Sequence, residues 1–423
     1  MEQRSMSIPK IVLYKGDVET TAFFLEQIGK ELRRMQIPVY EFQFDVGRAK
    51  EGKPQQIQRL LEFIEPGNTI VLSFNFAGVF GDDRLEAPED ELFVDVYALP
   101  YYNIVVDHPY HYHTHLAGRP KDYHQIDIDR NHIKYMERYF PEIDVLPFMP
   151  SAGTGLGESY LPLTDRPYDV VITGSYIPPE GFFVFMDRHG KEYGDFYRSM
   201  IKEVLDTPTG LLEDVVRKRL LEEIPEATEP EIKETLGHIQ FLDYYIRFFV
   251  RANVVRALTD GGIRVHAFGG GWENFTCEKP ENLLFESEEG ELITLKEAKD
   301  RGNVASRYLT SEECLDRIGR AKISLNVMPW FKDGAHDRIF NSMLNGALCL
   351  TDDSIYLREI LKDEENVCFY DLKETETLSG KVRKLLENPA HMERMIHSAY
   401  EYARDNHTWN NRARDIVGYL RKV

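Results

Sequence analysis

The sequence predicts an α/β protein with two Rossmann-like domains, each a parallel β-sheet covered by helices. Three observations lead to this prediction. The chain has 423 residues, more than one hydrophobic core usually organises. Short apolar runs alternate with amphipathic segments in both halves, as parallel strands and their covering helices do. Between the halves lies the segment SAGTGLGESYLPLTDRP, whose Gly, Ser and Pro content is typical of a linker.

The first half contains the elements expected of one such domain. Apolar runs predict strands, and apolar residues at helical spacing predict the helices between them. The strands are expected at 11–14, 39–44, 69–74, 104–107, 123–128 and 145–148, and the helices at 20–35, 57–64 and 131–139.

The second half repeats the alternation around a long helical insertion at about 194–260. Its strands are expected at 168–173, 264–268, 323–327, 347–351 and 367–370, and its helices at 337–344, 355–361 and 379–423. We therefore expect domains at 1–160 and 161–405, with ligands beyond the carboxyl ends of strands, in a cleft that both domains face.

Composition excludes several classes of protein. The net charge of -20 repels nucleic acid and anionic lipid at long range, so no nucleic-acid partner is expected. No apolar run reaches the roughly 18 residues of a membrane span, and the N-terminus lacks the pattern of a signal peptide. The four cysteines are scattered without a CxxC motif, which indicates reduced thiols and a cytoplasmic protein.

The densest functional signal lies at residues 324–353. A strand leads through a polar loop into a helix, and the amino end of a helix favours a bound diphosphate. Arg338 adds a bidentate donor there, and His336 adds another. The alternative is that Asp337 only caps the helix and Arg338 pairs with a surface carboxylate. The motif alone leaves both readings open.

The same stretch resembles part of a known family. The segments concerned are His336-Asp337-Arg338-Ile339-Phe340-Asn341, Asn345-Gly346-Ala347 with Thr351-Asp352, residues 169–176, Phe268-Gly269-Gly270-Gly271-Trp272, and His407-Thr408-Trp409 with Arg412. They resemble the donor-binding half of GT-B glycosyltransferases, specifically the bacterial glycosyltransferase-family-1-like group that includes spore-maturation-type proteins. Ser73-Phe74-Asn75 and Asp107-His108-Pro109 resemble that group's acceptor-side domain.

The resemblance implies a hexosyltransferase-like enzyme that needs no cofactor or metal and takes a nucleotide-diphosphate sugar as co-substrate. The acceptor would be a hydroxyl on a protein, a glycan or a small molecule. It also implies that a helix at 406–423 returns to the first domain. The donor-binding residues would be Gly174, Ser175, Tyr176, Gly270, Gly271, Trp272, His336, Asp337, Arg338, Ile339 and Asn341.

Two departures from the family pattern bear on the mechanism. Related retaining enzymes place two glutamates where this chain has Asp333 and Asn341. The Arg/Lys pair that they often carry after the first strand of the second domain is absent from 174–179. Asn341 can hydrogen-bond a ribose hydroxyl but cannot act as a carboxylate. Inversion and retention both stay open.

Asp107 and His108 are the expected catalytic residues. They follow the strand at 104–106, so a carboxylate and an imidazole stand at a strand's carboxyl end. In an inverting transfer, either could take the proton of the acceptor hydroxyl. The alternative is that Asp107 caps a turn fixed by Pro109.

A histidine-rich run suggests a competing hypothesis. His111, His113 and His115 alternate, so on a strand they would share one face and could bind zinc. A metal-dependent hydrolase using the His108–His115 cluster is therefore one alternative function. Others are a sugar-nucleotide epimerase on the same fold and a catalytically silent sugar-nucleotide-binding module. For the histidine run, a polar loop is favoured over a metal site. Asp127 and Asp129 could resemble a metal-binding pair, but helix capping is favoured for them.

Overall fold

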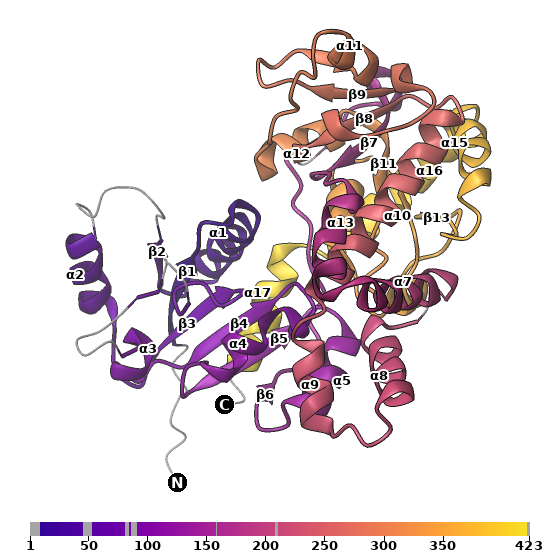
Figure 1. The fold of residues 1–423 in the computed structure, drawn as a ribbon. Helices are drawn as coiled ribbons and strands as arrows, with labels where there is room; N and C mark the ends of the chain where they lie inside the picture. The colour runs from indigo at the N-terminus through magenta and orange to yellow at the C-terminus, as the bar shows by residue number, and fades with distance from the viewer. Residues whose placement is uncertain are drawn as a thin grey trace. The chain divides into compact units, whose positions relative to one another are not determined.

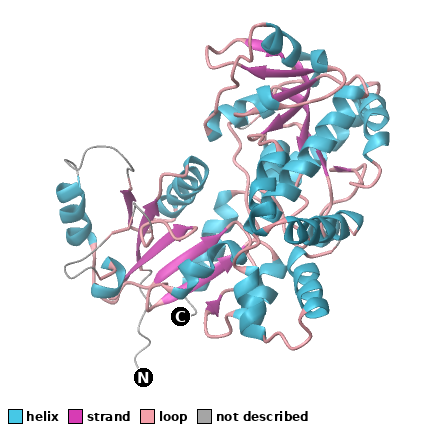
Figure 2. Cartoon of the chain, in the orientation of Figure 1, coloured by secondary structure: helices cyan, strands magenta, loops and turns pink. Residues whose placement is uncertain are grey.

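The chain divides into two units in the computed structural model, which describes residues 9–44, 53–80, 84–85, 91–157, 159–207 and 210–420. Unit 1 comprises residues 1–152 and 408–423, and unit 2 comprises residues 153–407. Each unit carries a sheet of largely parallel strands flanked by helices (Figure 2). The unit boundaries therefore lie at 152/153 and 407/408, against the expected 160/161 and 405/406.

Unit 1 has a six-stranded parallel sheet in the order β2-β1-β3-β4-β5-β6 (Figure 1). Every residue of β3 is buried, as the apolar run TIVLSF requires. The strands are β1 (Lys10–Lys15), β2 (Val39–Gln43), β3 (Thr69–Phe74), β4 (Tyr101–Val105), β5 (Tyr123–Asp127) and β6 (Asp144–Val145). The helices are α1 (Glu19–Arg34), α2 (Lys53–Phe63), α3 (Phe93–Val96), the 3₁₀ helix η4 (Pro109–Tyr112), α4 (His113–Ala117), α5 (Arg130–Tyr139) and α17 (Trp409–Leu420).

Helix α17 follows all of unit 2 in the sequence and yet packs in unit 1 (Figure 1, yellow). The ring of Trp409 lies 5.0 Å from that of Phe24 on α1, centroid to centroid. Beside it, Asn410 Nδ2 donates to Glu31 Oε2 at 2.9 Å. An aromatic contact and a hydrogen bond thus join α17 to α1, and both ends of the sequence contribute to one core.

Unit 2 has a seven-stranded sheet in the order β10-β9-β8-β7-β11-β12-β13, in which only β10 runs antiparallel to its neighbour. Five of its strands fall where the apolar runs predicted them. The β9–β10 hairpin was not predicted, because both strands are short and an acidic segment, residues 287–291, joins them. The strands are β7 (Tyr168–Thr173), β8 (Val265–Phe268), β9 (Leu283–Glu286), β10 (Leu292–Thr294), β11 (Ala321–Asn326), β12 (Leu348–Thr351) and β13 (Cys368–Phe369).

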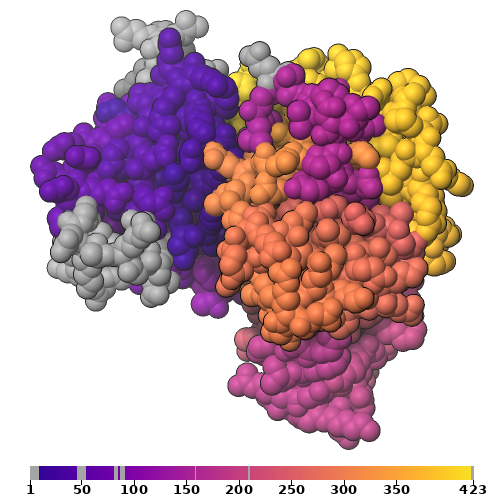
Figure 3. Space-filling view, turned by 90° about the horizontal axis from the view of Figure 1, so that it is seen from above, coloured from indigo at the N-terminus to yellow at the C-terminus, as the bar shows by residue number. Residues whose placement is uncertain are grey.

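The insertion predicted as one helical stretch is a group of separate helices that projects from unit 2 (Figure 3, pink). It is broken where the sequence offers a new helix start, as at Thr228, which forms a capping box with Glu231. Its helices are α6 (Phe183–Met186), α7 (Lys191–Asp206), α8 (Leu212–Glu223), α9 (Glu229–Leu236) and α10 (Gln240–Asp260). The other helices of unit 2 are α11 (Leu295–Asp300), α12 (Ser311–Gly319), α13 (Asp337–Leu344), α14 (Ile355–Ile360), α15 (Leu378–Leu386) and α16 (Pro389–Asn406).

The segment expected to be a free linker is largely bound to α13. Asn341 Oδ1 accepts from the backbone N–H of Thr154 at 2.8 Å. Asn345 Nδ2 donates to the Thr154 carbonyl at 2.8 Å, and its Oδ1 accepts from the N–H of Leu156 at 3.0 Å. Side-chain amides can pair with an extended backbone as a neighbouring strand does, so this part of the segment is ordered despite its glycines.

None of the helices in the described parts of the chain combines the length and the apolar character needed to cross a bilayer.

We predict that Asn345→Ala lowers the free energy of unfolding by about 1–3 kcal/mol, because it removes two part-buried hydrogen bonds to the backbone of the segment, each worth about 0.5–1.5 kcal/mol. Denaturant titration followed by circular dichroism measures this. Asn274→Ala is the control, since Asn274 is exposed and bonds only to Gly271 and Glu273 nearby. Equal midpoints for the two variants would show that the amide clamp contributes nothing.

Candidate functional site

The strand order of unit 2 reverses at β7, which pairs with β8 on one side and β11 on the other. In a doubly wound sheet, the loops after the strands at such a point diverge and leave room for a ligand. Here those loops begin at Gly174, Gly269 and Val327. The residues predicted to bind the donor thus come together at the carboxyl end of one sheet.

Glycines let the first two loops touch. Gly174 and Gly269 have φ angles of 121° and 144°, which side chains rarely allow. A Cβ on Gly269 would lie 2.6 Å from the carbonyl carbon of Gly174. The backbone of both loops is therefore exposed to a ligand without intervening side chains.

Two of the predicted donor residues support these loops from beneath. Trp272 is completely buried, and its indole Nε1–H donates to the Gly174 carbonyl at 2.9 Å. Tyr176 is also buried and stacks on Trp272 with centroids 5.3 Å apart. Both aromatic rings hold the shape of the loop and offer no free face, so we assign them a supporting role instead of donor contact.

Arg338 and Arg251 bring two positive charges to the Gly174 loop. Arg338, on the first turn of α13, has its Nη2 3.4 Å from the position that a Cβ of Gly174 would occupy. Arg251, on α10, is 6% exposed and donates to the Ser175 carbonyl. The two guanidinium groups flank the same stretch of backbone.

Neither arginine has a carboxylate partner among the residues that the structure describes. Arg338 Nη1 donates only to the Asn326 side chain, at 3.4 Å. The Nε of Arg251 is buried without a hydrogen-bond partner. The alternative in which Arg338 pairs with a surface carboxylate is therefore wrong for the described chain. The neighbouring Asp337 carboxylate offsets part of the charge of Arg338, and with Arg251 the site keeps an excess of positive charge.

The pKa values of both guanidinium groups are lowered. Burial, and then the charges of Arg338 and Arg247, lower the pKa of the Arg251 guanidinium from 12.5 to about 9. Burial likewise lowers the pKa of Arg338. Both groups remain charged at neutral pH. A bound anion would supply the missing counter-charge and the missing hydrogen-bond acceptors.

Arg247 differs from its two neighbours because it is already neutralised. Its Nη2 lies 2.6 Å from Asp243 Oδ2 on the same helix. Its guanidinium also stacks over Trp330, 4.5 Å from the ring centroid. Arg247 therefore ties α10 to the loop after β11 and leaves Arg251 and Arg338 as the charges available to a ligand.

The start of α13 contains the other predicted residues. His336 is its N-cap, with Nδ1 3.2 Å from the Arg338 N–H and 2.7 Å from Asp337 Oδ1. Asp337 therefore does not itself cap the helix, and it accepts from Asn341 Nδ2 at 2.8 Å. Since Asn341 also accepts from Thr154, each end of its amide makes one hydrogen bond within the protein, and the expected ribose contact stays a prediction. Ile339 is fully buried in the core.

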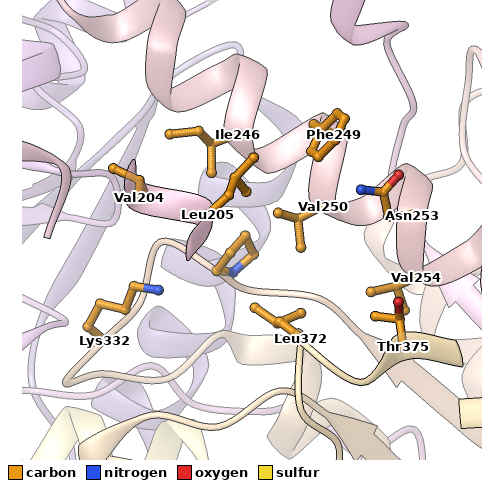
Figure 4. Close-up of a pocket in the computed structure, with 11 residues that line it drawn as sticks. Val204, Leu205, Ile246, Phe249, Val250, Asn253, Val254, Lys332, Leu372 and Thr375 are labelled. Atoms are coloured by element: carbon orange, nitrogen blue, oxygen red, sulfur yellow. The ribbon is translucent and has the colours of Figure 1, made fainter. Parts of the chain in front are cut away.

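Two hollows open beside the loop after β11, and Lys332 lines both. The first has a volume of about 150 Å³ and is largely apolar, between α7 and α10 (Figure 4). The second, of about 450 Å³, lies at the ends of β12 and β13 and contains several carboxylates. Among these, burial raises the pKa of Asp352 to about 7.

In unit 1, Asp107 follows β4 and lies in a polar setting. Its Oδ2 accepts from Tyr112 Oη at 3.1 Å and from Asn75 Nδ2 at 3.4 Å. Asn75 and the next residue, Phe76, have φ angles of 47° and 63°. Non-glycine residues in this region are strained, and such strain is found at functional sites. Asp107 is thus a half-buried carboxylate oriented by two side chains.

His108 is poorly placed to act as a base. It is 7% exposed, and its Nδ1 accepts from the N–H of Tyr110 as the cap of η4. Its ring stacks on that of Tyr110, with centroids 3.8 Å apart, and meets Tyr135 edge-on. Of the two residues predicted to be catalytic, Asp107 is the more exposed, and a catalytic role for either stays a prediction.

The histidine run does not form the strand that a shared metal face requires. Residues 109–117 are helical, as η4 and α4, so alternate positions point in different directions. His113 bonds to Tyr135 Oη at 2.7 Å, while His115 packs on Phe80. Among the described residues, the one group of possible metal ligands that lie close together is Asp363, Glu364 and Cys368, away from this run. Asp129 caps α5 through the Asn131 N–H at 2.8 Å.

Comparison with known proteins agrees with this geometry. Residues 247–418 match the family model described as glycosyl transferase-like. The carboxyl-terminal part of the chain is thus similar to glycosyl transferase-like domains. No curated protein sequence matches it significantly.

Solved structures share the GT-B fold of this chain at low sequence identity. A sucrose-phosphate synthase from Thermosynechococcus elongatus is 11% identical, with a TM-score of 0.51 over 98% of each chain. An alpha-glucosyltransferase in complex with UDP and a 13-mer DNA containing a HMU base is 9% identical, with a TM-score of 0.50 over 98% of this chain and 100% of that one. At such identity the likeness shows the fold alone.

The sequence alone did not indicate Arg251. Helix α10 lies within the helical insertion expected at about 194–260, where no donor-binding residue was predicted. The available signal was the spacing of Arg247 and Arg251, which are four residues apart on one predicted helix and therefore lie on one face of it.

We predict that Arg251→Ala and Arg338→Ala each weaken the binding of pyrophosphate by about 1.5–3 kcal/mol, because each removes a charge-assisted contact. Isothermal titration calorimetry measures the change. Arg217→Ala is the control, since Arg217 is already paired with Glu229 at 2.8 Å. Unchanged affinity in folded Arg251 and Arg338 variants would remove both residues from the site.

Proposed function

We propose that this chain is a glycosyltransferase that takes a nucleoside-diphosphate sugar as donor. Its diphosphate would lie between Arg251 and Arg338. The observation that carries the proposal is the pair of guanidinium groups without carboxylate partners, beside the glycine-lined backbone at Gly174. A diphosphate carries the opposite charge and enough oxygen atoms to accept from both groups.

The same two arginines would assist the chemical step. When the bond between the anomeric carbon and the phosphate oxygen breaks, the electron pair stays on the diphosphate, and its negative charge grows. Fixed positive groups that are already in place stabilise that charge without reorganising. We therefore propose a transfer that does not depend on a metal ion.

For the acceptor, we propose that Asp107 is the general base. The acceptor oxygen forms the new bond to the anomeric carbon and gives its proton to the Asp107 carboxylate. The hydrogen bonds from Tyr112 and Asn75 orient that carboxylate. In a retaining path, the departing phosphate oxygen would take the proton instead, and Asp107 would be dispensable.

We propose a protein, glycan or small-molecule hydroxyl as acceptor, in the cytoplasm. The net charge of -20 disfavours DNA, although one structure of the same fold contains it. None of the four cysteines forms a disulfide, which is consistent with a reducing compartment.

We predict that a nucleoside-diphosphate sugar at 100 times its Kd stabilises the protein by about 2.7 kcal/mol. A thermal-shift screen of UDP-, GDP-, ADP- and dTDP-sugars identifies the donor, and donor turnover is then followed with and without EDTA. Turnover should survive EDTA, because arginines supply the positive charge. Loss on chelation with rescue by Zn²⁺ or Mn²⁺ would contradict metal independence, and no shift with any nucleotide sugar would contradict the donor itself.

We predict that Asp107→Asn lowers the turnover number by about 10²–10⁴-fold, because the amide cannot accept the proton. Donor affinity should stay the same, since the donor residues belong to unit 2. Steady-state kinetics and a donor titration separate the two effects. His108→Ala should reduce turnover less than Asp107→Asn, and full activity of Asp107→Asn would favour the path in which the phosphate acts as base.

A further inference from the structure

Tyr308 is an unusually exposed aromatic residue. It lies between β10 and α12 in unit 2, and 76% of its surface is accessible, the largest fraction of any large hydrophobic side chain described. No aromatic contact or hydrogen bond of its side chain occurs within the described parts of the chain. A ring left in water in this way is not explained by the packing of the fold.

The exposed ring nevertheless has a defined place, because it lies on Gly270. A Cβ at Gly270 would come within 2.5 Å of Cζ of the Tyr308 ring and within 2.9 Å of two further ring atoms. Gly270 does not have a positive φ, unlike Gly269 and Gly271 beside it. Its backbone would therefore tolerate a side chain, and the ring of Tyr308 is what requires a glycine there.

The residues before Tyr308 are anchored to the same loop and to the sheet. Ser306 Oγ donates to Glu273 at 2.7 Å and accepts from the N–H of Trp272 at 3.0 Å. The side chain of Arg307 bonds to Glu286 at 2.7 Å and to Glu313 at 2.9 Å. These contacts hold the backbone that presents Tyr308, so little conformational freedom is lost when a ligand meets its ring.

The ring stands next to the proposed diphosphate site. Gly270 follows Gly269, whose backbone touches Gly174, and Gly174 lies against Arg338. One face of Tyr308 is thus supported by Gly270, while the charged part of the site begins at the adjoining residues. A nucleotide fits this arrangement. Its flat base can lie on Tyr308 while its diphosphate, joined to the base through the ribose, reaches the charged residues.

We propose that the base of the nucleotide donor stacks on the ring of Tyr308. The absence of a side chain at Gly270 leaves the space that this ring occupies. The inference rests on the proposed function and adds to it a residue that selects nucleotides over bare phosphates. Every base has a π-face, so stacking by itself favours no particular base.

The test compares nucleoside diphosphates with pyrophosphate by calorimetry, using the tightest binder among UDP, ADP, GDP and dTDP. Tyr308→Ala should raise the Kd of that nucleotide about 5- to 100-fold, the range that stacking of a base on an aromatic ring supplies. It should leave the Kd of pyrophosphate unchanged. Tyr308→Phe should bind as the wild type does, because the ring and not the hydroxyl makes the contact.

Gly270→Ala provides an independent arm, since the new methyl group displaces the ring without straining the backbone. It should weaken nucleotide binding about as much as Tyr308→Ala, and the double variant should be no weaker than either. Tyr193→Ala, at another exposed tyrosine of unit 2 (54% accessible), is the matched control and should change nothing.

Each outcome decides between the two proposals. Unchanged nucleotide affinity in Tyr308→Ala would overturn the role of Tyr308 and leave the proposed donor intact. A wild-type protein that binds pyrophosphate and none of the four nucleotides would overturn the proposed donor. Equal weakening of nucleotide and pyrophosphate by Tyr308→Ala would show a general disturbance of the loop and would also overturn the stacking role.

Discussion

The excess positive charge of Arg251 and Arg338, only partly offset by Asp337, is the constraint on which the candidate site of unit 2 depends. Two half-buried or buried guanidinium groups repel each other, and the pKa of each is lowered by burial. Such an arrangement destabilises the free protein, and it persists because neighbouring structure holds it. Arg247, paired with Asp243 and stacked on Trp330, fixes the helix that carries Arg251. A bound anion would balance the positive charge of the two guanidinium groups.

The backbone next to these charges is supported by two buried aromatic residues. Trp272 holds the Gly174 carbonyl from below, and Tyr176 fills the space beside it. Their bulk is the counterpart of the missing side chains at Gly174 and Gly269. A diphosphate can approach the backbone closely only where glycines leave room for it. A rigid support beneath the loop also helps, because a flexible loop would lose conformational entropy on binding.

The segment after residue 152 shows how a site can be stabilised from behind. Asn341 and Asn345 bind it along one side of α13, while Arg338 projects from the start of the same helix. Fixing α13 on one side fixes the direction of its charged end on the other. This accounts for an asparagine at 341 that makes two structural hydrogen bonds, where the family resemblance implied a contact with the donor.

The sequence by itself determined the fold class, most strands of both sheets and the position of Arg338, because apolar periodicity and a polar loop before a helix are local signals. It could not find Arg251, since the contact with Ser175 joins residues 76 positions apart. Nor could it separate the supporting Trp272 and Tyr176 from residues free to bind, or exclude a strand for the histidine run. Tertiary structure alone decided these points, because burial, pairing and the direction of a side chain are set by neighbours that lie far apart along the chain.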